Sequence, residues 1–444
     1  MSSITDEGVV NEGSGQADGA QPRFVFLGLP DVHGALRGKA LTEREFEAVV
    51  RRGEATMTDL LLALDPVDEP ITDYDTLGIR SGAADLTIVP ELDTLGPMAW
   101  RPGWQICLAT PLWSDGTLCD LGSRNVLRRS LDALAELDLE AMACFEYEVR
   151  FTDAADGTPL CHPLSYSLGE LAPFDVLAGE LHRALTALGI ELSAVHTEAG
   201  PGLLEINLGA SRGIRAADEA VLVKAAVKDV ARSLGMKASF LAKTHPLQEG
   251  SSGHLHVSLW DGDDNAFADG MDGRMAAAVG GALDHMPAAS LLYNPNLNSY
   301  KRLVPGYFAP VNATWGSDNR SAAVRTIAGG APSASRIELR RPGADANPYL
   351  ALAGAIASVV LGLRAGTTPP ACVTGDATEA GEALAPSLPG SLEAAIDAFA
   401  RDTELRGLLG ERFSEYYETS RRWELRAWQR AVTDWERERY ERTV

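Results

Sequence analysis

The stretch MACFEYEV, from Met142 to Val149, decides how this chain folds. Successive side chains of a β-strand point to opposite faces of its sheet, so Glu146 and Glu148 share one face and the aromatic residues share the other. Taken alone, the stretch predicts a half-buried strand with its acidic face in solvent. Paired carboxylates in a metal site become the better interpretation because the same pattern recurs three times.

The three recurrences alternate ligand-type polar residues with aliphatic residues in the same way. They are Leu203–Leu208, His254–Leu259 and Arg336–Arg340. Four unrelated solvent-facing strands would more often carry Lys, Thr, Ser and Gln. Carboxylates are the preferred ligands of hard divalent cations, so the segments predict a Mg²⁺ or Mn²⁺ site in a sheet. A zinc site is disfavoured, since no pair of cysteines has ligand spacing.

A basic cluster lies in the same part of the chain. Seven basic and three acidic residues lie between Lys301 and Asp345, although the whole protein has a formal charge of −23. Such a cluster in an acidic protein is typical of an anion site. It is too short and too poor in aromatic residues for a nucleic-acid surface. Arginines beside carboxylates that hold Mg²⁺ indicate phosphoryl transfer.

Taken together, these segments resemble the glutamine synthetase family. The matching pieces are FEYE (Phe145–Glu148), HTEAGPGLLE (His196–Glu205), GSSGHLHVSL (Gly250–Leu259), NSYKRLVPGY (Asn298–Tyr307), NRSAAVR (Asn319–Arg325) and RIELRRPGADANPYL (Arg336–Leu350). Their order and spacing agree over about 210 residues. The resemblance implies an α+β fold, in which a small β-grasp domain precedes a large catalytic α/β domain with an antiparallel half-barrel sheet.

The expected boundaries are a disordered tail over 1–21, the β-grasp domain over 22–110 and the catalytic domain over 111–444. In the first domain, strands are predicted at Arg23–Leu29, Leu86–Val89 and Gln105–Ala109, and a helix from a capping box at Thr42–Glu45 to about Arg52. In the second, helices are predicted at Ser123–Leu137, Pro173–Leu188, Ala216–Leu234, Pro348–Leu363 and within Ser391–Arg442. Gly366–Gly390 is predicted to be a loop.

Composition restricts the class of protein. The 444 residues, 45% of them hydrophobic and 23% charged, are typical of a soluble protein with two domains. The sequence contains no run of 18 apolar residues, so it predicts no membrane span. The N-terminus lacks the apolar core of a signal peptide. Five scattered cysteines suit a reducing compartment. We therefore expect a cytoplasmic protein that binds neither membranes nor nucleic acid.

The resemblance implies roles for individual residues and two or more Mg²⁺ or Mn²⁺ ions. The first ion would be held by Glu148, Glu198 and Glu205, and the second by Glu146, His254 and Glu338. ATP would be bound by His256, Ser258, Arg320, Arg325 and Arg336, and the amino acid by Gly250, Arg302, Arg340 and Glu249. The expected catalytic residues are Arg320, Arg340 and Glu338. The alternatives are a hydrogen-bonded core histidine at His256 and surface charges at Arg336 and Arg341.

The implied reaction has two steps. ATP phosphorylates the γ-carboxylate of glutamate, and an amine then attacks the acyl phosphate and expels phosphate. Water has to be excluded, since it would hydrolyse the activated intermediate. The family further implies a homo-oligomer, a dodecamer of two stacked hexameric rings.

The chain departs from the family pattern in the amine half of the site. Members that use ammonia have Glu in a PGYEAP loop, where it binds ammonium and removes its proton, whereas the loop here reads PGYFAP with Phe308. The family's D-G-S-S segment is absent, and Asp59 is only a tentative substitute for its carboxylate. Leu203 and Glu249 stand where Gln and Asn are usual. This pattern resembles the γ-glutamylamide synthetases, which join glutamate to polyamines, ethanolamine or other primary amines, and Phe308 offers apolar surface to such an amine.

Two other functions stay open. One is a glutamine synthetase that uses ammonia, in which Phe308 only packs a loop. The other is a non-catalytic scaffold or regulatory relative, which is disfavoured because buried carboxylates are costly without a cation. The sequence names no particular amine, and Glu249 leaves open an analogue of glutamate as the acyl donor.

Overall fold

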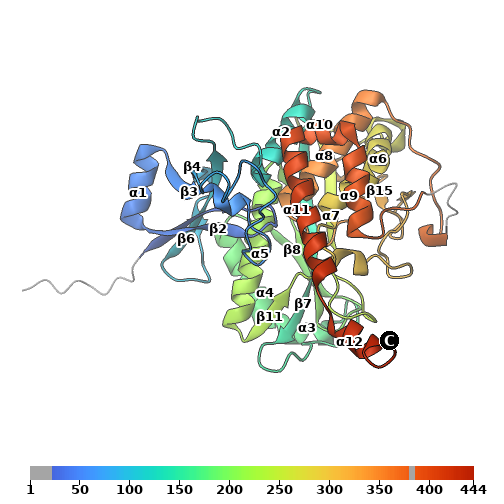
Figure 1. Ribbon diagram of the computed structural model, residues 1–444. Helices are drawn as coiled ribbons and strands as arrows, with labels where there is room; N and C mark the ends of the chain where they lie inside the picture. The colour runs from blue at the N-terminus through green and yellow to red at the C-terminus, as the bar shows by residue number, and fades with distance from the viewer. Residues whose placement is uncertain (1–22, 380–385) are drawn as a thin grey trace, which may run out of the picture.

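The computed structural model describes residues 23–379 and 386–444, so the predicted tail over 1–21 lies outside the described residues. Two sheets organise the described chain (Figure 1). The first has six strands and uses residues 24–112, and the second has ten strands between residues 140 and 339. The α+β architecture expected from the sequence is confirmed.

The first sheet has the strand order β2-β1-β6-β4-β3, with β5 paired to β6. Its strands are β1 (Phe24–Pro30), β2 (Leu36–Thr42), β3 (Ala55–Thr58), β4 (Asp85–Pro90), β5 (Gly96–Pro97) and β6 (Trp104–Leu112). Helix α1 (Glu43–Arg52) begins where predicted, because the Thr42 hydroxyl accepts a hydrogen bond from the backbone amide of Glu45. It ends at Gly53, whose left-handed backbone suits glycine.

The second sheet has the order β14-β15-β16-β12-β7-β9-β8 and is antiparallel except between β14 and β15. Its strands are β7 (Glu140–Asp153), β8 (Leu192–Thr197), β9 (Leu203–Leu208), β10 (Ser211–Arg212), β11 (Met236–Ser239), β12 (Gly253–Asp261), β13 (Asp264–Asn265), β14 (Trp315–Ser317), β15 (Val324–Ile327) and β16 (Arg336–Leu339). The four segments with alternating polarity are all strands, as predicted. The longest of them, β7, lies in the middle of the sheet.

Helices cover the apolar side of this sheet (Figure 1). The helices after the first sheet are α2 (Ser123–Ala135), α3 (Leu168–Leu171), α4 (Asp175–Ala187), α5 (Arg215–Ser233), α6 (Arg274–Asp284), α7 (Met286–Tyr293), α8 (Pro348–Ala365), α9 (Leu392–Arg401), α10 (Thr403–Leu409), α11 (Glu411–Arg430) and α12 (Asp434–Tyr440), and the last of them has no buried residue. Helix α8 is long and apolar enough to cross a membrane, but 78% of it is buried inside the protein. It is the central core helix, packed against α2, α5, α6, α7 and α10.

The two faces of β7 differ as its sequence predicts. Phe145, Tyr147 and Val149 are buried in the core against α5, and the two glutamates point to the opposite face. On α5, the buried ammonium of Lys224 lies over the Tyr147 ring and donates hydrogen bonds to two backbone carbonyls in the loop after β16. This packing fixes β7 from behind and leaves its polar face to line a cavity.

A buried ion pair joins the helices at the far end of the core. Nδ1 of His285, between α6 and α7, lies 2.7 Å from Oδ2 of Asp402, which also caps α10. Burial opposes charge on both groups. The hydrogen bond between them nevertheless raises the pKa of His285 and lowers the pKa of Asp402 relative to their ordinary values.

This pair should make stability depend on pH. Since the pKa of His285 is raised in the folded state, its contribution is complete below the unfolded value of about 6.5 and is lost as pH rises through the folded value. The depressed pKa of Asp402 gives a contribution that is lost only under acidic conditions. We expect His285→Asn to lower the free energy of unfolding by about 1–2 kcal/mol at pH 5.5, and by less at pH 8.5. Chemical unfolding at the two pH values tests this, and equal losses at both would contradict it.

Candidate active site

The polar faces of four strands line a cavity of about 430 Å³. Its floor is formed by β7, β9, β12 and β16, and loops between the strands close its sides. The predicted site residues that line it are Glu146, Glu148, Glu198, Glu205, Glu249, Gly250, His254, Arg302, Phe308, Arg320, Arg325, Glu338 and Arg340. Segments more than 190 residues apart in sequence therefore meet in one place.

Strand register explains why these side chains meet. On β7, Glu146 lies opposite His254 of β12, and Glu148 lies opposite Glu205 of β9. On the far side of β12, His256 lies opposite Glu338 of β16. Directly opposed residues of antiparallel strands have Cβ atoms about 5 Å apart. Each i, i+2 pair in the sequence thus becomes part of a row that crosses the sheet.

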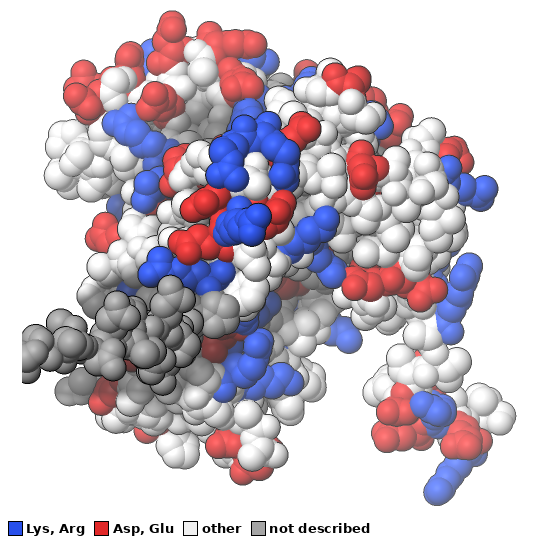
Figure 2. All heavy atoms as spheres, turned by 90° about the vertical axis from the view of Figure 1, so that its left-hand side faces the viewer, with Lys and Arg blue, Asp and Glu red and all other residues white. Residues whose placement is uncertain are grey.

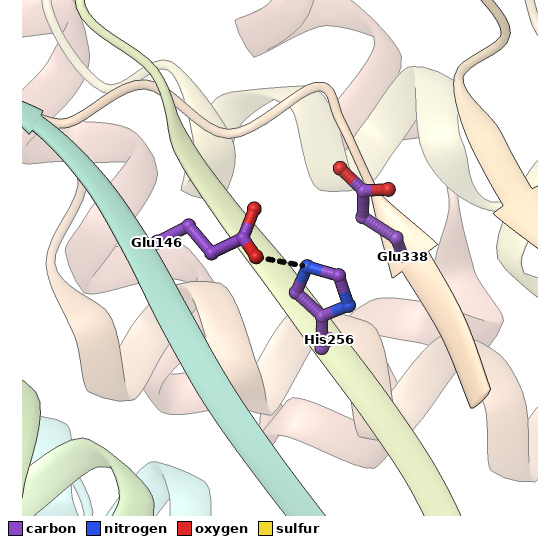
Figure 3. Close-up of side chains that lie close together, drawn as sticks. All are labelled: Glu146, His256 and Glu338. Atoms are coloured by element: carbon purple, nitrogen blue, oxygen red, sulfur yellow. Dashed lines mark ion pairs between the residues drawn. The ribbon is translucent and has the colours of Figure 1, made fainter. Parts of the chain in front are cut away.

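Three groups of ligand-type residues have donor atoms within 4.8 Å of one another. The first group contains Glu146, His256 and Glu338, which project toward one another from three neighbouring strands (Figure 3). The others are Glu146 with Glu205 and His254, and His196 with Glu198 and Glu205. This grouping differs in detail from the two ligand sets that the resemblance implies, since it includes both His196 and His256.

Glu148 and His196 account for that difference. Among the described residues, Glu148 belongs to none of the three groups, because one of its oxygens accepts hydrogen bonds of 2.7 Å from both the amide and the hydroxyl of Ser252. The imidazole of His196 lies 3.1 Å from Glu205 and 3.4 Å from Glu198. His196 was missed as a site residue, although it opens the motif HTEAGPGLLE, two positions before Glu198.

The electrostatics of the first group favour ionised carboxylates. Burial opposes ionisation, but the imidazoles of His254 and His256, whose nitrogens lie 3.8 and 3.1 Å from its carboxylate oxygens, hold the pKa of Glu146 far below its usual range. Glu338 is fully buried, which opposes ionisation, but the charge of Arg340 and the neighbouring imidazoles of His254 and His256 outweigh burial and lower its pKa to about 2. Both side chains therefore carry negative charge at neutral pH.

The surroundings of Glu198 have the opposite effect and oppose its ionisation. Burial and the charges of Glu148 and Glu205 raise the pKa of Glu198 above its ordinary value. Carboxylates crowded in this way are stabilised by a cation between them. The carboxylate and imidazole donors gathered here fit Mg²⁺ or Mn²⁺, because oxygen atoms predominate among them.

Arginines surround the carboxylates. Arg340 donates a hydrogen bond to Glu338, and Arg325 lies 3.0 Å from the same carboxylate while it also pairs with Asp318. The guanidinium of Arg302 is buried, and burial lowers its pKa to about 10. Arg320 lines the cavity but remains exposed. The arrangement offers fixed and movable positive charges to an anionic ligand.

Three residues predicted to bind nucleotide lie at the edge of this region. Buried His256 contacts Glu146 and accepts a hydrogen bond from half-buried Arg336, whereas the Ser258 hydroxyl accepts one from Trp260. None of the three lines the cavity among the described residues, so their predicted role remains a prediction. Arg341, considered as a surface charge, is buried and donates to the Pro310 carbonyl.

Gly250 and Glu249 form the side of the cavity next to Arg302. A Cβ at Gly250 would lie 2.3 Å from Cγ of Arg302 and 2.6 Å from the Ala242 carbonyl oxygen, so no larger residue fits there. Glu249 lines the cavity, and its backbone carbonyl accepts a hydrogen bond from Arg150. The need for glycine at position 250 is therefore explained by the Arg302 side chain, which packs directly against the backbone there.

Aromatic residues also belong to the lining of the cavity. Phe308 is 64% exposed, lines the cavity, and has a left-handed backbone with φ of 52°. Tyr166, which the sequence did not suggest, also lines it, and so does Leu203. Asp59 is buried elsewhere, where it accepts a hydrogen bond of 2.6 Å from Ser81. Within one chain, therefore, Asp59 is not among the described residues that line this cavity.

Comparison with known proteins gives a consistent result. Residues 120–440 match the family described as glutamine synthetase, catalytic domain. A glutamate–isopropylamine ligase from Pseudomonas sp is 31% identical, covering 94% of each chain. A γ-glutamylethanolamide synthetase from Streptomyces coelicolor is 32% identical, covering 93% of this chain and 91% of the other.

Relatives named glutamine synthetase match over a similar length. A glutamine synthetase from Thermotoga maritima is 33% identical, covering 94% of this chain and 96% of its own. Among solved structures, a complex of GmaS with ADP superposes with a TM-score of 0.82 at 27% identity, covering 94% of this chain and 96% of the other. The likeness therefore extends through both sheets and not only through the motifs.

Proposed function

The chain belongs to the glutamine synthetase family, and we propose that it is an ATP-dependent ligase that joins the γ-carboxylate of glutamate to a primary amine. The observation that carries the proposal is a cavity lined both by the carboxylates and arginines predicted from the sequence and by Phe308. The names of two similar proteins, which specify isopropylamine and ethanolamide, support the same assignment.

Glutamine synthetases use ATP and divalent cations, and the cavity's donor set suits such ions. We propose that the ligands are Glu146, Glu148, Glu198, Glu205, His254 and Glu338, with His196 and His256 as neighbours of the same groups. Bound cations would neutralise charge on the phosphate and carboxylate oxygens during phosphoryl transfer. The strands hold these side chains in place before any ligand arrives, because register fixes their spacing.

The arginines would then bind the two anionic substrates. Arg320 and Arg325 are proposed to hold the phosphates of ATP, and Arg302 and Arg340 the carboxylates of glutamate. Gly250 lines the cavity and allows the Arg302 side chain to pack against its backbone, where glutamate is proposed to bind. In this arrangement the γ-carboxylate attacks the terminal phosphorus of ATP and displaces ADP. The amine nitrogen then attacks the carbonyl carbon of the acyl phosphate, expels phosphate and loses a proton.

The amine is proposed to enter beside Phe308. A phenyl ring can neither bind an ammonium ion by charge nor remove a proton from it, but it can bury the carbon chain of an amine. The competing function is a glutamine synthetase that uses ammonia. The similarity to the glutamine synthetase from Thermotoga maritima supports this alternative.

One measurement separates the two functions. Phosphate release from ATP is followed with glutamate present and with no amine, ammonium, ethanolamine, isopropylamine, putrescine or spermine added. The ligase proposal expects a primary amine to be at least tenfold better than ammonium. Ammonium as the best acceptor would support the glutamine synthetase, and no release with any acceptor would support a non-catalytic relative.

We further propose a homo-oligomer of stacked hexameric rings. Trp428, Trp435 and Tyr440 are exposed on a C-terminal segment that stands away from the body of the protein (Figures 1 and 2). By contrast, the indole of Trp423 packs within the subunit and lies 3.3 Å from Asp65. Exposed aromatic residues gathered in this way favour contact with another chain.

Light scattering tests the assembly directly. We expect a particle of about twelve times the 47.3 kDa chain mass at working enzyme concentration. Trp435→Asp, which places a charge on the exposed segment, should reduce that mass, while Arg51→Asp on exposed α1 serves as a surface control. A monomeric wild-type protein would contradict the proposal.

A further inference from the structure

Two exposed aromatic residues of the cavity share an unusual backbone conformation. Tyr166 has φ of 55° and Phe308 has φ of 52°, and their side chains are 72% and 64% exposed. The left-handed region is costly for residues with a bulky side chain, and such strain is retained mainly at functional sites. Exposing two large rings to water adds a second cost, which a ligand with an apolar part would relieve.

Tyr166 is held by its neighbours on β8. Its ring stacks on the His196 imidazole with centroids 4.4 Å apart and planes 23° from parallel. Its backbone amide donates a hydrogen bond of 2.9 Å to the Thr197 carbonyl. The ring position is therefore fixed beside the carboxylate group formed by His196, Glu198 and Glu205.

Phe308 separates the main cavity from a second one. The second cavity has a volume of about 540 Å³ and shares Phe308 and Arg320 with the first. Asn319 ties its walls together, because the side-chain amide donates hydrogen bonds to the carbonyls of Val373 and Gly375. An amine that passes Phe308 would thus extend along an open cavity whose lining residues, such as Ser317 and Thr374, are mostly exposed.

The charges around this second cavity are unfavourable for a cation. Its lining includes the exposed guanidinium of Arg320. The one carboxylate in the described lining belongs to Asp318, and both the Nε and a terminal nitrogen of Arg325 donate to it. Glu249, on the other side of the main cavity, is close to the positive charges of Lys243 and Arg150. Ser317 and Thr374 add neutral polar groups to the second cavity.

We propose that the tail of the amine lies between Tyr166 and Phe308 and ends in the second cavity, so that the enzyme selects primary monoamines with a short uncharged tail over diamines and polyamines. The inference rests on the proposed ligase function and specifies its substrate class. The reacting nitrogen stays in the main cavity near Glu198. An alkyl or hydroxyalkyl tail meets aromatic rings and neutral polar groups, whereas a second ammonium group meets Arg320 without an unpaired carboxylate.

Three amines with the same four-carbon chain test this selection: butylamine, 4-amino-1-butanol and putrescine. We expect kcat/KM for each of the first two to exceed that for putrescine by about tenfold or more at pH 7.5. Equal use of putrescine and butylamine would overturn the tail assignment while leaving the ligase function intact. If ammonium alone supports turnover, the ligase function itself fails, and the tail assignment fails with it.

A charge introduced into the second cavity provides a direct control. Thr374 is exposed in its lining, so Thr374→Asp should raise putrescine use about five- to tenfold and change butylamine use less than threefold. The matched variant Thr368→Asp places the same charge on an exposed residue outside that lining and should change neither. Equal effects of both variants on putrescine would overturn the assignment.

Tyr166 tests the other side of the tail. Asn tolerates the left-handed backbone, so Tyr166→Asn removes the ring without adding strain. It should raise KM for butylamine about tenfold and leave KM for glutamate unchanged, while Tyr166→Phe should retain most of the wild-type KM. An unchanged butylamine KM in Tyr166→Asn would contradict contact between this ring and the tail.

Discussion

Glu338→Gln is expected to reduce ATP-dependent phosphate release by about a thousandfold or more. Glu338 has no exposed surface and lies among His254, Arg325 and Arg340. Gln keeps the size of the side chain and one acceptor oxygen but removes the negative charge. The change therefore acts on the charge that would hold a divalent cation and orient two arginines, and leaves the volume of the core almost unchanged.

The loss of activity has to be separated from loss of folding. Thermal unfolding of Glu338→Gln should remain cooperative, and equilibrium dialysis should show weaker retention of Mn²⁺ than in the wild type. Glu415→Gln, the same substitution at an exposed position on α11, is the control and should retain full activity. If Glu338→Gln kept more than a tenth of wild-type phosphate release, the assignment of this carboxylate to the reaction centre would be wrong.

The strands that form the floor of the site were predictable because their alternation is strong. Each of β7, β9, β12 and β16 has one face of aliphatic or aromatic residues and one of ligand-type residues, and this period of two has no helical equivalent. Amphipathic helices such as α2 were predicted for the corresponding reason. Pattern alone was sufficient wherever one side of an element meets the core and the other does not.

Helices α6 and α7 were missed for other reasons. Gly280 and Gly281 suggest a break within α6, and α7 is an apolar segment of only eight residues. The structure gives these glycines a packing role. A Cβ at Gly281 would lie 2.3 Å from the Ser358 carbonyl oxygen and 2.5 Å from Cα of Gly362, so glycine allows α6 to approach α8 closely.

Within the site, the sequence could indicate which residues share a face but not which residues of different strands become neighbours. Glu148 lies opposite Glu205 across the sheet, yet its carboxylate turns to Ser252. His196, with no alternating partner of its own, joins Glu198 and Glu205 through strand register. Asp59 is a second example. Its position in the sequence gave no indication that its carboxylate would accept a hydrogen bond from Ser81 within the N-terminal part of the chain that forms the first sheet.

Phe308→Glu is expected to remove most of the preference for an alkylamine over ammonium. In the wild type, ammonium should be a poor acceptor, because binding a small cation and removing its proton require a carboxylate or an equivalent base. An alkylamine gains from contact with Phe308, at about 0.8 kcal/mol for each CH₂ fully removed from water. Two or three methylenes then give a ~10- to 50-fold preference over ammonium if the pocket is closed.

Phe308→Glu changes the charge of the side chain but leaves the backbone strain at this position the same. Phe, Glu and Leu all have a Cβ and meet the same strain at φ of 52°, so Phe308→Leu controls for the loop conformation. Phe308→Glu should lose most of the preference for butylamine over ammonium, as measured by the ratio of kcat/KM values, whereas Phe308→Leu should retain much of it. Ammonium use should rise in Phe308→Glu, since the new carboxylate joins the lining of the cavity that Glu198 also lines. If wild-type enzyme uses ammonium as efficiently as every alkylamine tested, Phe308 only packs its loop, and an ammonia-dependent glutamine synthetase becomes the better assignment.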